Sequence, residues 1–147
     1  MRIPLLAPLL FTLLTACAGA GYQKAPRPVE GAPVPGDRCR VYLARADGTT
    51  GSIRQVRVLD SEVEVGAIAE DEYLCWDRPP ERGIGTLVYE GFAPARRGVE
   101  NVFDLPREAG STTWFVITIP HSGRQPQVEA LSPDEGRALI ARRKPAR

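Results

Sequence analysis

The sequence has few of the residues that build metal and nucleic-acid sites. Of its 147 residues, one is histidine and three are cysteine, and 19 basic against 18 acidic residues leave a net charge of +1. So few imidazoles and thiols, widely spaced, do not form the ligand pattern of a zinc site. The balanced charge argues against a protein that holds nucleic acid through a basic face. No apolar run reaches the ~20 residues that a membrane-spanning helix needs.

The first 16 residues have the features of a secretory signal. Arg2 supplies a short positive region, and the stretch from Ile3 to Leu14 is apolar. About a dozen apolar residues are too few to span a bilayer but match the central region of a signal peptide. We therefore expect this segment to be removed and to contribute nothing to the fold.

The signal ends in Leu14, Thr15, Ala16 and Cys17, a run that resembles the lipobox of bacterial lipoproteins. The resemblance implies that the Cys17 thiol receives a diacylglyceryl group and that residues 1–16 are then cut away. Ala18 stands where an inner-membrane lipoprotein of this kind carries Asp, so the resemblance implies the outer membrane, facing the periplasm. The alternative is an ordinary signal peptide with an incidental cysteine.

Proline and glycine are frequent, 14 of each, and they gather after the signal. Residues 17–37 hold four prolines and little apolar content, which predicts an extended tether that reaches up to ~60 Å. Residues 38–143 form one predicted domain, and 144–147 a tail.

Alternation of apolar and polar residues predicts a mainly β, antiparallel β-sandwich-like domain. The expected strands span residues 40–43, 53–59, 63–68, 73–76, 85–92, 101–105 and 112–119. The last of these is apolar on both faces, which favours an interior strand. Ser132, Pro133 and Glu135 then predict the start of a short C-terminal helix.

Several stretches in this order resemble the DUF2846 lipoprotein-like family of bacterial envelope domains. They are residues 40–43, residues 63–66 followed by Tyr73, residues 105–110 leading into 114–116, and residues 131–137. The resemblance implies a β-sandwich-like lipoprotein domain, and it implies no activity because the family's function is unknown.

Cys39 and Cys75 remain once Cys17 is set aside. In an oxidising compartment an even pair favours a disulfide, and the loop entropy removed would stabilise the domain by roughly 3–4 kcal/mol. The alternative is two separate buried thiols.

Side chains that could bind an envelope polymer are Trp76, Arg96 and Arg97, which we take as a candidate binding surface. The competing interpretation places Trp76 in the core and leaves the arginines solvated. His121 beside Ser122 lacks an orienting carboxylate for nucleophilic catalysis. The acidic run of residues 70–72 lacks the spacing of a calcium loop and reads as a turn.

No catalytic, cofactor or metal motif stands out, so we expect a protein that is not an enzyme. The sequence predicts a lipid-anchored envelope protein that acts as a binding or assembly module for another envelope protein. The alternative is a binding module for peptidoglycan or lipopolysaccharide.

Overall fold

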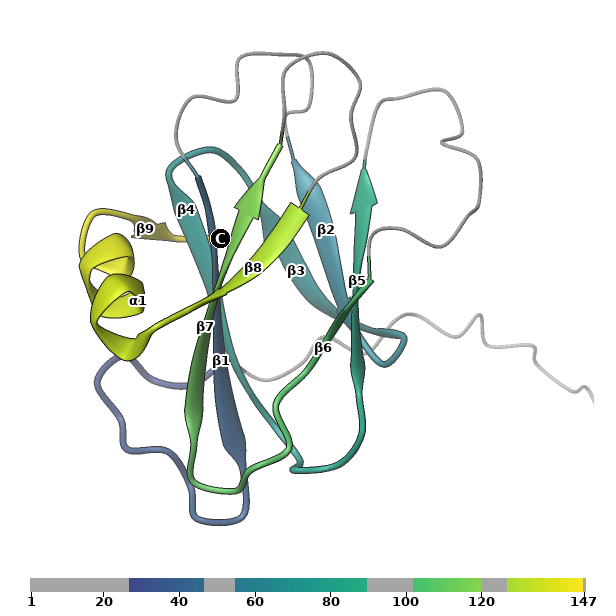
Figure 1. The fold of residues 1–147 in the computed structure, drawn as a ribbon, viewed down its shortest axis with the longest axis vertical. Helices are drawn as coiled ribbons and strands as arrows, with labels where there is room; N and C mark the ends of the chain where they lie inside the picture. The colour runs from purple at the N-terminus through teal and green to yellow at the C-terminus, as the bar shows by residue number, and fades with distance from the viewer. Residues whose placement is uncertain (1–26, 47–54, 90–101, 120–126, 147) are drawn as a thin grey trace, which may run out of the picture.

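The computed structural model describes residues 27–46, 55–89, 102–119 and 127–146 as two packed β-sheets with one short helix (Figure 1). The predicted mainly β, sandwich-like fold with a C-terminal helix is confirmed. The elements are β1 (Cys39–Arg45), β2 (Val56–Asp60), β3 (Val63–Ile68), β4 (Glu72–Arg78), β5 (Ile84–Tyr89), β6 (Val102–Asp104), β7 (Thr112–Thr118), β8 (Gln127–Leu131), α1 (Pro133–Ile140) and β9 (Lys144–Pro145).

The strands divide into a five-stranded sheet, ordered β8-β7-β1-β4-β9, and a four-stranded sheet, ordered β3-β2-β5-β6. Most neighbours run antiparallel, whereas β1 pairs in parallel with β7, and β4 with β9. The strand predicted to be interior is β7, and it does lie inside the five-stranded sheet. Its position explains why apolar and β-branched residues occupy both of its faces.

The core lies between the two sheets. Strand side chains alternate between faces, so every second residue points inward. The five-stranded sheet contributes Val41, Leu43, Leu74, Trp76, Phe115 and Ile117, and the four-stranded sheet contributes Val56, Val58, Val65, Ile68 and Leu87.

A tight turn between the predicted strands 53–59 and 63–68 joins β2 to β3. Ser61 and Glu62 both have positive φ, 48° and 75°. A two-residue hairpin turn with both φ values positive matches the twist of its strands, although glycine or asparagine adopts it more easily. A register shift between Val58 and Leu59 accompanies the turn.

Helix α1 begins as the sequence predicts. The Ser132 hydroxyl accepts from the Glu135 backbone N–H, and the Glu135 carboxylate accepts from the Ser132 backbone N–H in return. The helix rests on the five-stranded sheet through Gly136, where a Cβ would lie 2.1 Å from the Trp114 side chain. Glycine is therefore needed here for close approach rather than for its backbone freedom.

Two short segments differ from the sequence prediction. Residues 127–131, not predicted as a strand, form β8 at a sheet edge, where polar exposed residues weaken the alternation signal. Residues 144–146, predicted as a tail, extend the other edge: the Lys144 N–H donates to Asp71 O over 2.9 Å, and the Ala146 N–H to Tyr73 O over 2.8 Å. Pro145 between them has no N–H to donate and is tolerated because β9 is an edge strand.

Candidate functional site

The two cysteines lie on opposite faces of the five-stranded sheet, so the predicted Cys39–Cys75 disulfide is wrong. In the pairing of β1 with β4, Cys39 lies opposite Arg78 and Cys75 lies opposite Tyr42. Their register positions differ by three residues, and an odd difference places two side chains on opposite faces. Cys39 is buried on the inner face, and both residues are free thiols.

Trp76 does not belong to a binding surface, which corrects a second prediction. Its side chain is 1% exposed and lies in the core between the sheets. The other predicted surface residues, Arg96 and Arg97, lie outside the described residues. So do Cys17 and the lipobox residues Leu14, Thr15 and Ala16, as well as His121.

The indole of Trp76 belongs to a buried polar cluster centred on Asp60. The Asp60 carboxylate oxygen Oδ2 accepts from Trp76 Nε1 and from Arg78 Nε, both over 2.9 Å. Arg78, 2% exposed, also donates through Nη1 to the carbonyls of Glu81 and Pro106. These donors of Trp76 and Arg78 all have acceptors, so the cluster ties β2 to β4 and the following loops and leaves no group for a ligand to bind.

The outer face of the five-stranded sheet carries a second polar and aromatic group. Arg40 and Asp77 form a two-point ion pair, with Nε to Oδ1 at 2.7 Å and Nη2 to Oδ2 at 2.9 Å. Beside it the rings of Tyr42 and Trp114 stack, with centroids 6.1 Å apart and planes 7° apart. The Arg137 guanidinium lies 5.8 Å from the Trp114 ring centroid, so α1 covers that end of the face.

Residues 27–36, which we call the strap, cover the other end of this face. The sequence assigned them to the tether. The Arg27 guanidinium donates to Ala146 O, and Arg40 donates to the carbonyls of Ala32 and Pro33. Pro28, Ala32 and Val34 are half-buried in this arrangement. The strap is therefore part of the domain surface in this structure.

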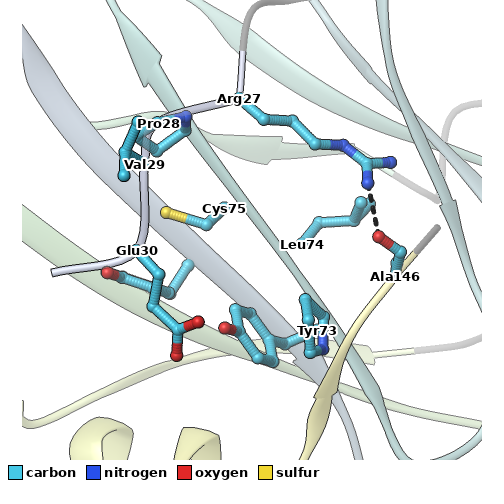
Figure 2. A pocket seen from close by; sticks show the side chains of 10 residues that line it. Arg27, Pro28, Val29, Glu30, Tyr73, Leu74, Cys75 and Ala146 are labelled. Atoms are coloured by element: carbon cyan, nitrogen blue, oxygen red, sulfur yellow. Dashed lines mark hydrogen bonds between the residues drawn. The ribbon is translucent and has the colours of Figure 1, made fainter. Parts of the chain in front are cut away.

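A small cavity of about 90 Å³ lies between the strap and the sheet (Figure 2). It has room for a few water molecules, because a cavity needs at least ~10–15 Å³ to hold one. Its walls are the strap residues Arg27, Pro28, Val29 and Glu30, the sheet residues Tyr42, Tyr73, Leu74 and Cys75, and the C-terminal Pro145 and Ala146. The Cys75 sulfur points toward Pro28 and Val29 of the strap.

Burial raises the pKa values of the thiol and the tyrosine hydroxyls that line the cavity. It raises the pKa of Cys75 to about 11, and the nearby Tyr42 hydroxyl and Arg40 guanidinium oppose this only in part. Burial also raises the pKa of Tyr42 to about 12, and the pKa of Tyr73 rises through burial and the Glu30 charge. The nucleophile of cysteine chemistry is the thiolate. A thiol with this pKa remains protonated at neutral pH and suits packing better than catalysis.

We expect Cys75 to react slowly with a maleimide and to show an unusual pH dependence. Below its pKa the thiolate fraction rises tenfold per pH unit, so the rate should still be climbing above pH 9, where an ordinary thiol levels off near its pKa of ~8.5. The measurement is the labelling rate of the folded protein from pH 7 to 10, with Cys75→Ser as control. A plateau near pH 8.5 would contradict the burial argument. Adding a reductant should leave the melting temperature unchanged, because Cys39 and Cys75 are not joined by a disulfide.

The outer face of the four-stranded sheet presents exposed aliphatic side chains. Ile84 and Val88 project from β5 and are 45% and 36% exposed, and Val102 on β6 is 53% exposed. Val102 pairs with Thr86, which lies between Ile84 and Val88 on the same face, so Val102 is a diagonal neighbour of both Ile84 and Val88. We call these three residues the aliphatic face. Two charged groups border these side chains: exposed Asp104 lies opposite Ile84, and Arg57, opposite Val88, pairs with Glu64 over 2.6 Å.

Within the described part of the chain, no three His, Cys, Asp or Glu side chains lie close enough to share a metal ion. No helix there is long and apolar enough to cross a membrane. No protein-family model matches the chain. No curated protein shows significant similarity to it either. The resemblance to lipoproteins therefore stays a prediction from the residues that carry it.

Arg40, Tyr42 and Asp77 were not among the site residues predicted from the sequence. Alternation along residues 40–43 already places Arg40 and Tyr42 on one face, opposite to Val41 and Leu43. Alternation alone does not identify the partner strand or its register, and these bring Asp77 to Arg40 and Cys75 to Tyr42. The available signal for this site was Arg40, a charged residue inside a predicted strand whose other face is apolar.

Proposed function

We propose that the chain is a lipid-anchored protein of the bacterial envelope that acts as a non-catalytic binding module for another envelope protein. The lipobox-like run ending in Cys17 supports the anchor. The aliphatic face supports the binding role, and it is the observation on which the proposal depends. Clustered exposed aliphatic side chains are typical of surfaces that contact a partner, whereas single ones are common on any protein.

The two outer faces of the sandwich differ in a way that favours this choice. Helix α1 and the strap cover the outer face of the five-stranded sheet, where Trp114 and Tyr42 are packed. Ile84 and Val102 on the other sheet keep about half of their surface exposed. A partner that covered them would remove apolar surface from water, which is the usual source of binding free energy.

A photo-crosslinking residue placed at Val88 tests this surface in living cells. We expect one discrete protein adduct, and we expect Ile84→Asp in the same chain to reduce its yield at least tenfold. Ile84 points away from the core, so the substitution places a charge on the contact surface, and repulsion from Asp104 on the paired strand costs only about 1 kcal/mol or less.

The matched control carries the same crosslinker at Ala138, an exposed position on α1. A protein adduct found at position 88, absent at 138 and sensitive to Ile84→Asp supports the proposal. Equal adducts from both positions, or none from either, would contradict it. An adduct that a muramidase digests would instead favour the polymer-binding alternative.

A further inference from the structure

The strap joins the domain to the sequence that leads back to Cys17, and it is held near both ends. Near its start, Arg27 donates to the carbonyl of Ala146, which follows β9. Further along, Arg40 reaches from β1 to the carbonyls of Ala32 and Pro33. Backbone carbonyls that accept from a guanidinium form charge-assisted hydrogen bonds, which are stronger than neutral ones.

Asp77 orients the Arg40 guanidinium for its hydrogen bonds to the strap carbonyls. The two-point ion pair uses the Nε–H and one N–H of Nη2, and it orients Nη1 and the other N–H of Nη2 toward the strap carbonyls. The charge and hydrogen bonds of Asp77 also raise the pKa of Arg40, so the guanidinium stays charged. With the strap in place Arg40 is 4% exposed. When the strap leaves, water can solvate the freed donors, so both arrangements satisfy the guanidinium.

The position of the strap determines how much chain separates the domain from its anchor. Arg27 is ten residues after Cys17, and Arg38, the residue before β1, is 21 residues after it. An extended chain spans at most ~3.6 Å per residue, so these lengths reach about 36 Å and about 75 Å.

We propose that residues 27–36 are a releasable strap that keeps the domain close to the membrane, and that its release about doubles the reach of the domain. This inference rests on the proposed lipid anchor at Cys17. Release extends the distance over which the aliphatic face can meet a partner, and it uncovers the cavity at Cys75.

Strap docking can be tested on the full chain with an added cysteine. Val29 and Cys75 line the same cavity, and the Cys75 sulfur points toward this part of the strap. In Val29→Cys, mild oxidation is expected to form a 29–75 disulfide that peptide mass spectrometry identifies. Val29→Cys combined with Cys75→Ser is the control and should form none. Failure of the disulfide to form would overturn the docked strap.

Reach can be tested on the lipidated protein in vesicles that contain dansyl-labelled lipid headgroups. Trp76 and Trp114 are the donors and the dansyl groups the acceptors. We expect Arg27→Gln combined with Arg40→Gln, which removes the guanidinium contacts near both ends of the strap, to lower energy transfer by roughly half or more, because the domain can then move farther from the bilayer. Arg38→Gln is the control, since it removes a positive charge from an exposed side chain whose ion-pair partner is Asp37.

A second variant distinguishes loss of strap docking from unfolding caused by the two arginine substitutions. Replacing residues 28–36 by Gly and Ser at equal length leaves the sheet intact and weakens docking through the greater freedom of the unbound chain. It should lower energy transfer in the same way, whereas the 29–75 disulfide should hold transfer at the wild-type value. Unchanged transfer in the Gly/Ser variant would overturn the proposal. If wild type itself fails to join vesicles, the lipid anchor is wrong, while the disulfide still decides whether the strap docks.

Discussion

Cys17→Ser is expected to move the protein from the membrane fraction to the soluble fraction almost completely. A single acyl chain binds membranes with an association constant of only about 10⁴ M⁻¹, and two or more chains give stable anchoring. The variant loses all of them at once. With 19 basic and 18 acidic residues in the chain, little electrostatic attraction to anionic lipid remains to replace the anchor. Fractionation of cells, with mass spectrometry of the N-terminal peptide, measures both the location and the lipid.

Cys75→Ser is the matched control, because it makes the same atomic change at a cysteine that the lipobox does not include. It should leave the protein in the membrane fraction. Membrane association that survives Cys17→Ser, or an N-terminal peptide that lacks lipid in the wild type, would contradict the proposed anchor.

Asp60→Ala is expected to lower the free energy of unfolding by about 3–5 kcal/mol. The substitution leaves the buried Arg78 guanidinium without its carboxylate, and breaking a buried ion pair from one side typically costs this much. It also removes the acceptor of Trp76 Nε1. Urea denaturation followed by circular dichroism measures the loss, and the change in tryptophan fluorescence reports on the cluster itself.

Glu64→Ala is the comparison for this prediction. Its partner Arg57 is also on β2, and the ion pair is shorter, 2.6 Å against 2.9 Å for Asp60 and Arg78, but both side chains are about a quarter exposed. Partly exposed pairs contribute about 1 kcal/mol or less because water and salt screen them. Equal losses from the two substitutions would show that the Asp60 cluster is no more important than a surface pair.

Local features of the sequence were sufficient to locate most elements. The alternation in residues 63–68 and the β-branched run from Thr112 predicted β3 and β7, because the two faces of a strand meet different environments. Ser132 and Glu135 predicted the start of α1, because their reciprocal hydrogen bonds join residues only three apart. Such signals depend on neighbours in the chain and need no knowledge of the fold.

The candidate site could not be predicted in the same way. Arg40, Asp77 and the carbonyls of Ala32 and Pro33 come from three segments, and only the pairing of β1 with β4 and the return of the strap bring them together. Trp76 illustrates the same limit. An aromatic residue in a strand can face a ligand or the core, and the choice depends on which face the opposite sheet covers.

The sequence by itself determined most strand positions, the mainly β class and the short C-terminal helix, because period-two alternation and helix capping are local properties. The tertiary structure alone decided the partners: β1 pairs in parallel with β7, more than sixty residues away, and its register with β4 sends Cys39 inward and Cys75 outward. A shift of one residue in that register would exchange the faces of either strand, and distant contacts rather than local pattern select it. For the same reason the cysteine count suggested a disulfide that the sheet does not allow.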